Sequence, residues 1–214
     1  MSFDPRTEYQ DTDTAEQYDQ KRFSTLSGKL FQWAEQRVLE RILGEVPRGS
    51  LVMDAPCGTG RLLPLYLSKG LRLVGSDISA EMINVARRRT ERWKDGRNFL
   101  RMDFVQIPLS DNSVDAVFSI RFLPHFPPSE RIRMLREFRR VSRGQVIISL
   151  SVSNGWMRVR RIIKAMLGHD KPVRNPATLT EICHELNTAG LKQIKWFWTF
   201  PILSEQIILI CEKA

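Results

Sequence analysis

The sequence is poor in the features that mark several large classes of protein. No apolar run approaches the roughly 18–20 residues that span a bilayer, and the acidic residues 1–19 lack the basic and apolar regions of a signal peptide. The chain has three cysteines, no C-x-x-C pair and three scattered histidines, which favours neither a disulfide framework nor a zinc cluster. We therefore expect a protein of the reducing cytoplasm that holds no metal.

Positive charge is in excess and is unevenly distributed. The formal net charge is +9, from 33 Lys and Arg against 24 Asp and Glu. Residues 131–174 hold twelve Lys or Arg and two Asp or Glu, whereas residues 1–19 hold six acidic residues and one arginine. We call 131–174 the basic strip. A strip of this kind is typical of contact with nucleic acid, an anionic membrane or an acidic substrate.

The basic strip has two parts with different readings. The arginines of its first part fit the solvated outer face of a helix. Its second part, GWMRVRRIIKAMLG (155–168), is amphipathic and suits a membrane interface, an anionic substrate or a lid packed on the body. The arginines of the first part are Arg131, Arg133, Arg136, Arg139, Arg140 and Arg143.

One helix is predicted before the regular part of the chain begins. In residues 26–43 apolar side chains recur at helical spacing, and Pro47 and Gly49 then interrupt the pattern. The apolar residues at this spacing are Leu30, Trp33, Ala34, Val38 and Ile42.

From residue 51 onward, short apolar runs alternate with amphipathic helical patterns. Such alternation implies a mainly parallel sheet with helices on both faces, and such a sheet binds ligands at its carboxyl edge. No long helix separates the last two strands, so we expect them to pair antiparallel. The predicted strands are 51–55, 71–77, 98–103, 113–120, 144–152, 191–200 and 205–213. The predicted helices are 61–70, 79–93, 129–142 and 178–190.

A glycine-containing turn follows the first of these strands. It reads DAPCGTG (54–60), and the glycines Gly58 and Gly60 permit a sharp turn against which a ligand can lie. An ordinary tight connection between a strand and a helix would have the same composition. The turn alone therefore does not identify a binding site.

Acidic residues recur where the first three strands end. Asp54, Asp77 and Asp103 each follow an apolar strand. A carboxylate in such a place can accept two hydrogen bonds from a ribose diol or one from an exocyclic amine. Each of them could instead cap a helix or make a turn. The recurrence at three strand ends favours a nucleoside-binding edge.

These segments resemble, in order and spacing, the successive motifs of class I S-adenosylmethionine-dependent methyltransferases. The resemblance is carried by VMDAPCGTGR, VGSDISAEMINVARRR, MDFVQIPLSDNSVDAVFSI and RFLPHF, over about residues 50–150. These motifs are most similar to the small-molecule type that includes ubiquinone and menaquinone biosynthesis methyltransferases. Pro56 stands where the first motif usually has a glycine. A dinucleotide-binding fold would normally show a third glycine, which is missing after Gly60.

The resemblance implies an α/β, Rossmann-like fold with a seven-stranded, mainly parallel sheet, helices on both faces and an antiparallel C-terminal strand. It also implies S-adenosylmethionine as cofactor and S-adenosylhomocysteine as product. By this resemblance Asp54 lies near the methionine amino group, Asp77 takes the ribose hydroxyls and Asp103 accepts from the adenine amine. The other implied cofactor-binding residues are Cys57, Gly58, Gly60, Ile78, Met82, Phe104, Ser119 and Arg121, with Tyr18 and Arg22 in an N-terminal lid.

The chemistry asks little of the protein beyond alignment. The methyl group on a sulfonium is already activated, so positioning supplies much of the acceleration and a dedicated base is optional. His125, in FLPHF after the fourth strand, is the candidate general base. A loop histidine with a packing role is the alternative reading of the same residue.

We expect a single domain over residues 1–214. Its parts are a helical arm or lid (1–47), a cofactor-binding core (50–152), a substrate-covering insert (153–180) and a C-terminal helix with a strand pair (181–214). The expected function is methyl transfer to a small-molecule acceptor, lipophilic or anionic, with peripheral membrane contact as an open question. Two alternatives remain: an RNA or tRNA methyltransferase that uses the basic strip, and a non-catalytic cofactor-binding partner protein.

Overall fold

The computed structural model describes residues 25–93, 95–153, 166, 175–200 and 205–214. In this part of the chain the strands are β1 (Leu51–Asp54), β2 (Arg72–Asp77), β3 (Arg97–Arg101), β4 (Val114–Ser119), β5 (Ser142–Ser151), β6 (Leu191–Trp198) and β7 (Gln206–Lys213). The helices are α3 (Leu26–Leu43), α4 (Leu63–Ser68), α5 (Ala80–Arg89), the short 3-10 helix η1 (Leu123–His125), α6 (Pro128–Val141) and α8 (Leu179–Thr188).

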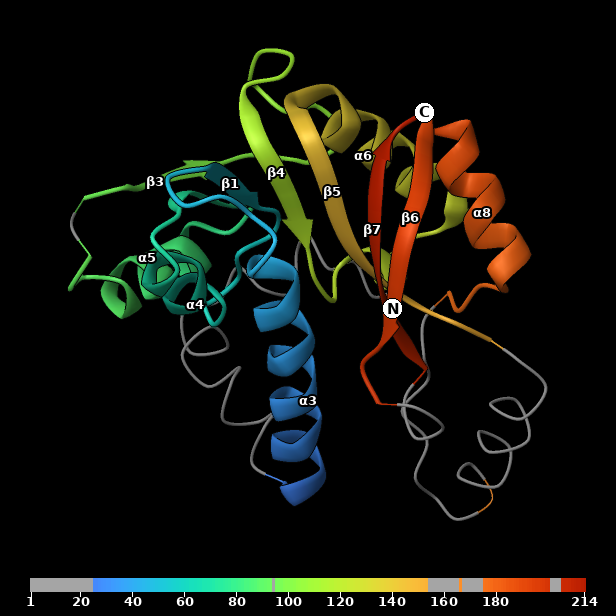
Figure 1. Ribbon diagram of the computed structural model, residues 1–214, viewed down its shortest axis with the longest axis horizontal. Coiled ribbons are helices and arrows are strands. Elements are labelled where there is room, and N and C mark those ends of the chain that lie inside the picture. The colour runs from blue at the N-terminus through green and yellow to red at the C-terminus, as the bar shows by residue number, and fades with distance from the viewer. Residues whose placement is uncertain (1–24, 94, 154–165, 167–174, 201–204) are drawn as a thin grey trace.

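All seven strands form one sheet in the order β3-β2-β1-β4-β5-β7-β6 (Figure 1). Strands β1 to β5 pair in parallel, and β7 pairs antiparallel with both β5 and β6. The predicted fold is therefore confirmed, including its antiparallel C-terminal pair. Strand order reverses between β1 and β4, so the carboxyl ends of these two strands flank the place where open α/β sheets bind ligands.

Helices cover both faces of the sheet because successive strand residues alternate between two apolar clusters. Val52 packs in the cluster beneath α3, α4 and α5, whereas its neighbour Met53 packs in the cluster beneath α6 and α8. Leu73 and Val74 on β2 divide in the same way. The sheet is thus buried on both sides, and its connecting loops at the carboxyl edge remain available for chemistry.

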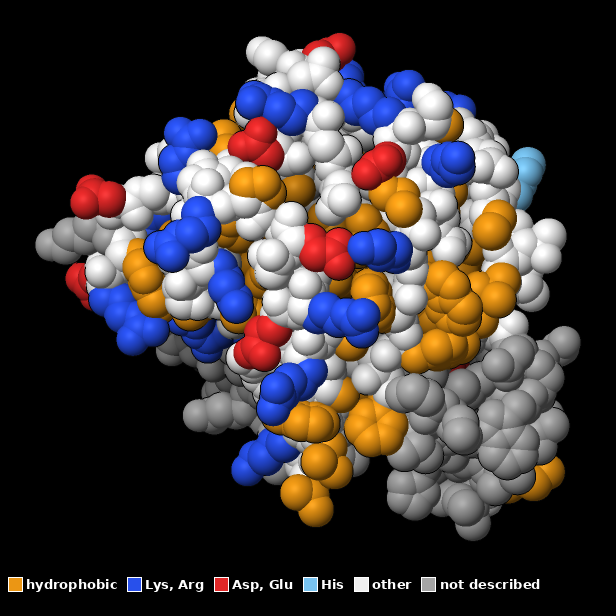
Figure 2. All heavy atoms as spheres, viewed as in Figure 1, with side chains coloured by type: hydrophobic (Ala, Val, Ile, Leu, Met, Phe, Trp, Pro, Cys, Tyr) orange, Lys and Arg blue, Asp and Glu red, His pale blue; other side chains and the backbone are white. Residues whose placement is uncertain are grey.

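Helix α3 has the predicted bounds, but two of the apolar residues that recur at helical spacing lie outside the core. The side chain of Thr25 caps its start by accepting from the N–H of Gly28 at 3.1 Å. Leu30 and Trp33 are 50% and 57% exposed. They are exposed because the first turns of α3 extend past the sheet (Figure 1), and apolar side chains gather at that tip (Figure 2). The buried positions of α3 are Ala34, Glu35, Leu39, Ile42 and Leu43.

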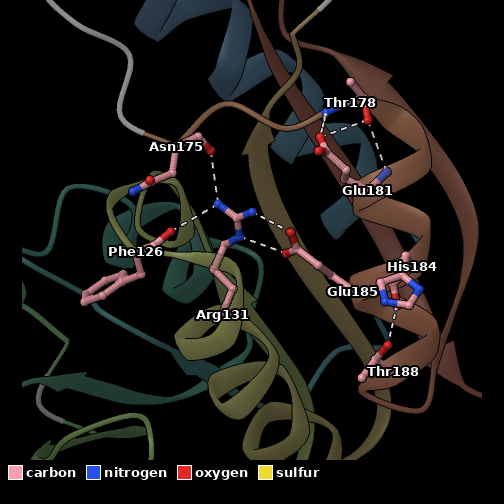
Figure 3. Close-up of polar contacts among 8 residues, drawn as sticks. All are labelled: Phe126, Arg131, Asn175, Thr178, Glu181, His184, Glu185 and Thr188. Atoms are coloured by element: carbon pink, nitrogen blue, oxygen red, sulfur yellow. Dashed lines mark hydrogen bonds and ion pairs between the residues drawn. The ribbon is translucent and has the colours of Figure 1, made fainter.

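The first part of the basic strip is only partly a solvated face, which corrects that prediction: Arg133, Arg136 and Arg143 are exposed, whereas Arg131 is buried. Arg131 on α6 is 2% exposed, and its Nε donates to Glu185 on α8 at 2.8 Å while its Nη2 donates to the second oxygen of the same carboxylate. Its Nη1 donates to the carbonyls of Phe126 and Asn175 (Figure 3). A buried guanidinium needs such full pairing because desolvation of an unpaired charge costs several kcal/mol.

Other arginines of the strip also serve the fold. Arg139 donates to the carbonyl of Gly190 at 2.9 Å. Arg140 donates to the carbonyls of Ile107 and Leu109 at 2.8 and 2.7 Å, and pairs with Asp111. Basic and acidic side chains are also interspersed on the face shown in Figure 2. Most of the arginines in 131–143 therefore hold neighbouring loops or α8 against α6 through hydrogen bonds and ion pairs. No helix among the described residues is long and apolar enough to cross a bilayer.

Candidate active site

Three acidic residues lie at one edge of three adjacent strands. Asp54 is the last residue of β1 and Asp77 the last of β2, and the register pairs Asp54 with Gly75 and Asp77 with Arg101 at the end of β3. Asp103 follows two residues later and its Oδ1 accepts from the N–H of Val105 at 3.2 Å. Since the carboxyl ends of parallel strands lie at the same edge, the three carboxylates predicted to bind a nucleoside lie at the carboxyl edge of the sheet.

The glycine turn after β1 is held by backbone hydrogen bonds to neighbouring strands. The N–H of Cys57 donates to the carbonyl of Ser76 at 2.7 Å, and that of Ala55 donates to the carbonyl of Phe118 at 2.8 Å. The peptide bond that joins Ala55 to Pro56 is cis. The turn is therefore fixed directly beside the ends of β2 and β4.

The two glycines of the turn, to which the resemblance assigns one role, have different surroundings. Both have positive φ, 52° at Gly58 and 76° at Gly60. A Cβ built on Gly60 would lie 2.8 Å from both Cα and Cβ of Ala86, so this glycine lets the turn rest against α5. A Cβ built on Gly58 meets nothing within 4 Å. Gly58 is therefore the glycine that leaves room for a ligand over the turn.

Asp77 connects the glycine turn to the start of α5. Its Oδ2 accepts from the N–H of Gly58 at 2.9 Å and its Oδ1 accepts from the N–H of Ser79 at 3.0 Å. Burial raises the pKa of Asp77 to about 6, although these two backbone hydrogen bonds oppose the rise. The N-terminal cap of α5 is Ser79 itself, whose Oγ accepts from the N–H of Met82 at 3.1 Å.

Asp54 and Cys57 lie in the same buried environment. Burial raises the pKa of Asp54 well above its ordinary value, against the charge of Arg61 and a 3.5 Å hydrogen bond from the Tyr66 hydroxyl, and the charge of Asp77 adds to the rise. Burial also raises the pKa of the Cys57 thiol, as do the charges of Asp77 and Asp54. The thiol therefore stays protonated at neutral pH, which gives it the character of a packing residue.

The end of β4 and the segment that follows it contribute three of the predicted residues. Ser119 is fully buried, and its hydroxyl has no hydrogen-bond partner among the described residues. Arg121 has a φ of 61°, its N–H donates to the Oγ of Ser149 at 2.6 Å, and its Nε donates to Glu35 at 2.6 Å. His125 ends η1 shortly afterwards. Backbone held in the left-handed region is found disproportionately at functional sites.

The remaining predicted residues flank this edge. Ile78 is half-buried after β2, and Met82 is buried in the first turn of α5. The Phe104 ring is enclosed in the core, with ring centroids 5.2 Å from Phe122 and 6.2 Å from Phe138. Of the two roles that the resemblance implies for Phe104, the backbone role fits this burial better than contact through the ring face.

Sequence reasoning missed one buried charged residue near this edge of the sheet. Glu35 on α3 is fully buried, and its carboxylate accepts from Arg61 and Arg121 at 2.6 Å each and from the Nε2 of Gln206 at 2.9 Å. The sequence does indicate a paired carboxylate here, because a glutamate among the apolar positions of a helix is rarely buried without a partner. The partners could not be read from the pattern, since they come from distant parts of the chain.

Comparison with known proteins decides the family. A family model described as "Methyltransferase domain" matches residues 52–145, which include the glycine turn and all three acidic strand ends. This chain contains a class I S-adenosylmethionine-dependent methyltransferase domain. The family predicted from the sequence is confirmed, and the cofactor of that family is the predicted one.

Two curated relatives show the range of proteins that share this methyltransferase domain. A mouse (Mus musculus) tRNA (carboxymethyluridine(34)-5-O)-methyltransferase, ALKBH8, is 31% identical over 156 residues, which cover 68% of this chain and 22% of that protein. A demethylmenaquinone methyltransferase of Renibacterium salmoninarum is 30% identical over 142 residues, 64% of this chain and 55% of that protein. The chain thus spans from about a fifth to about half the length of these relatives.

Solved structures agree on the fold of the methyltransferase domain. The magnesium protoporphyrin IX methyltransferase of Synechocystis PCC 6803, crystallised with S-adenosylhomocysteine, superposes with a TM-score of 0.73 at 19% identity. The superposition covers 95% of this chain and 98% of that one. A methyltransferase from Aquifex aeolicus gives a TM-score of 0.67 at 21% identity, over 95% of this chain and 99% of that one.

Several predictions fall outside the described residues. Tyr18 and Arg22, expected in an N-terminal lid, are among them. So is the amphipathic segment 155–168, on which the question of membrane contact depends, except for Met166, which is exposed. The predicted cofactor-binding residues that the structure does describe lie at the ends of β1, β2 and β4, in the loops that follow β1 to β4 and, for Met82, in the first turn of α5.

Proposed function

We propose that this chain binds S-adenosylmethionine across the carboxyl ends of β1 to β4 and transfers its methyl group to a small-molecule acceptor. The observation that carries the proposal is the alignment of Asp54, Asp77 and Asp103 at one edge of three adjacent strands, beside the open space over Gly58. S-adenosylmethionine, when bound, supplies an activated methyl group, so this chain's own residues need to bind, orient and exclude water.

The residues fit that cofactor. The carboxylate of Asp77 accepts two backbone N–H groups and has lone pairs left for ribose hydroxyls. The buried Ser119 hydroxyl, without a partner among the described residues, is a donor or acceptor for the methionine end. Asp103 lies beyond β3, where it would accept from the adenine amine. His125 borders the acceptor side and can hold a proton released by an oxygen or nitrogen nucleophile.

A binding experiment tests the cofactor site. Isothermal titration of the full chain with S-adenosylhomocysteine should show binding, and Asp77→Ala should weaken it at least tenfold through loss of the ribose contacts. Asp95→Ala is the matched control, because Asp95 is exposed in the loop before β3. Equal affinity in Asp77→Ala and wild type would refute the site assignment.

A transfer experiment tests the activity and sorts the acceptors. Labelled S-adenosylmethionine is incubated with the enzyme and with separate lipid, small-molecule and RNA fractions of a lysate, and incorporation is expected in one of the first two. Label released as volatile methanol by mild alkali would identify a carboxyl ester. Label in no fraction, from a chain that binds the cofactor, would favour the non-catalytic alternative.

A tRNA acceptor is the second candidate, because ALKBH8 and a human (Homo sapiens) probable tRNA methyltransferase 9B, 33% identical over 129 residues, are named for tRNA. The structure gives this reading less support than the sequence did, since Arg131, Arg139 and Arg140 are bound within the fold. Filter binding of tRNA at rising salt decides between the candidates. An RNA enzyme should lose affinity steeply between 50 and 200 mM salt, about 1,000-fold for six phosphate contacts.

Peripheral membrane contact belongs to this proposal only for a lipophilic acceptor. The segment 155–168 motivates it through its sequence pattern. Sedimentation of the full chain with vesicles that contain anionic lipid, compared with vesicles of neutral lipid, tests it. Equal recovery in both pellets at low salt would argue against an electrostatic contact.

A further inference from the structure

Glu35 is a fully buried carboxylate outside the three acidic strand ends. It lies on α3, before the methyltransferase domain matched at 52–145 begins. Its partners come from three separate places: Arg61 from the end of the glycine turn, Arg121 from the loop after β4 and Gln206 from β7. One side chain therefore joins an N-terminal helix to the carboxyl edge of the sheet.

Burial of the Glu35 carboxylate costs free energy that a residue with only a packing role would not require. Burial alone would raise the pKa of Glu35, but the charges of Arg121 and Arg61 and its hydrogen bonds hold the pKa below its ordinary value. The carboxylate is therefore ionised at neutral pH, in a place where an apolar side chain would avoid the desolvation cost of several kcal/mol. Its neighbours along the buried face of α3, such as Ala34 and Leu39, are apolar.

The arginines that it holds are placed at the methionine end of the proposed site. Arg61 directly follows Gly60, and its charge acts on Asp54, the residue assigned to the methionine amino group. Arg121 lies two residues beyond Ser119, has a φ of 61°, and places its guanidinium 4.5 Å from the centre of the Phe31 ring. Guanidinium groups bind carboxylates through paired N–H donors when their orientation is fixed.

We propose that Glu35 is a positioning residue that orients Arg61 and Arg121 to bind the methionine carboxylate of the cofactor. The inference rests on the proposed function, because it needs the cofactor to lie along this edge. It makes cofactor affinity depend on the docking of α3. Glu35 itself touches the arginines and not the ligand.

Two ligands separate positioning from a structural role. S-adenosylhomocysteine carries the amino-acid end, whereas 5′-methylthioadenosine has the same adenosine and thioether without it. In isothermal titration of the full chain, Glu35→Gln should weaken S-adenosylhomocysteine about tenfold or more and leave 5′-methylthioadenosine within about twofold. Glu35→Asp should restore part of the difference. Glu45→Gln is the matched control, because Glu45 makes an exposed ion pair with Lys195.

A second variant keeps the test decisive if Glu35→Gln does not fold. Arg121→Gln leaves the pair between Glu35 and Arg61 in place and should show the same selective loss. Equal weakening of both ligands, or no weakening of S-adenosylhomocysteine, would overturn the positioning role. Failure of the wild-type chain to bind either ligand would instead refute the proposed function.

Discussion

The N–H of Gly58 donates to the Oδ2 of Asp77 at 2.9 Å, so the glycine turn after β1 and the acidic end of β2 form one unit. The bond explains how a buried carboxylate is kept in place before any ligand arrives. This hydrogen bond stabilises the ionised form of the Asp77 side chain, whereas burial destabilises it. Burial is the larger effect, since the pKa of Asp77 rises to about 6. Three predictions concern this unit.

The ionisation of Asp77 should reduce the stability of the unliganded protein above pH 6. Its pKa rises from 3.8 to about 6 on folding, so the folded state holds a proton that the unfolded chain releases between these values. The free energy of unfolding therefore falls as pH rises through that window. Asp77→Asn removes the ionisation and should gain on the order of 1 kcal/mol at pH 7.5 after the loss of one hydrogen bond.

Urea unfolding of Asp77→Asn and wild type at pH 4.0 and 7.5 checks this prediction. The difference between the two proteins should be larger at pH 7.5, because the wild-type carboxyl is protonated and neutral at pH 4.0. The comparison cancels most of the contribution of Asp54, which both proteins share. A difference of the same size at both pH values would contradict the assignment of the shift to Asp77.

Cofactor affinity should also depend on the ionisation of Asp77, but it should rise with pH, whereas the stability of the unliganded protein falls. Ribose hydroxyls donate best to the ionised carboxylate, and that form predominates above pH 6. The affinity for S-adenosylhomocysteine should therefore be nearly constant above pH 6 and fall by up to about tenfold per unit below it. Titration calorimetry from pH 5.0 to 7.5 measures this slope. Asp77→Asn should bind weakly with a shallower slope, and a flat wild-type profile would be inconsistent with the ribose role.

The two glycines of the turn should respond differently to alanine. Gly60→Ala places a Cβ 2.8 Å from the backbone of Ala86 at a φ of 76°, so we expect a loss of roughly 2–4 kcal/mol of stability. Gly58→Ala adds a methyl group to open space at a φ of 52°, with a strain of about 1 kcal/mol. Gly58→Ala should therefore fold and lose cofactor affinity.

Thermal unfolding and ligand titration of both alanine variants check the distinction. The order of stability should be wild type, then Gly58→Ala, then Gly60→Ala. A Gly58→Ala variant that binds S-adenosylhomocysteine as tightly as wild type would show that the open space over the turn is not used by the cofactor.

The fold and the acidic edge were predictable because each depends on short-range pattern. Alternating apolar runs specify strands, and the residue after each run lies at the edge, so Asp54 and Asp77 could be placed without coordinates. The surroundings of Glu35 could not be predicted, because they depend on how α3 packs on the sheet and on which distant arginines Glu35 contacts. The exposure of Trp33 has the same cause: periodicity identifies an apolar side of a helix, not how much of it the body covers.

Charge was the least predictable property, and Arg131 shows why. A run of arginines on a helix looks alike in sequence whether it faces water or a partner helix. Only the position of α8 brings Glu185 opposite Arg131 and gives the guanidinium four acceptors (Figure 3). The role of each arginine in the basic strip therefore depends on how the helices pack and does not follow from the sequence pattern.

The pair of Arg131 and Glu185 should show strong energetic coupling. Arg131→Met leaves a buried carboxylate unpaired and should cost about 3–5 kcal/mol, and Glu185→Leu should cost a similar amount through the stranded guanidinium. The double variant removes both charges and should recover most of this loss. It should remain on the order of 1–2 kcal/mol less stable than wild type, because the carbonyls of Phe126 and Asn175 lose their donor.

Urea unfolding of the four proteins in a double-mutant cycle measures the coupling. Arg133→Met, on the exposed side of α6, is the control for replacing an arginine by methionine in that helix and should change stability by less than about 0.5 kcal/mol. Coupling of several kcal/mol would establish the pair as a structural fastening between α6 and α8. Additive losses in the double variant would mean that each residue is held by its other contacts and that the pair does not fasten α6 to α8.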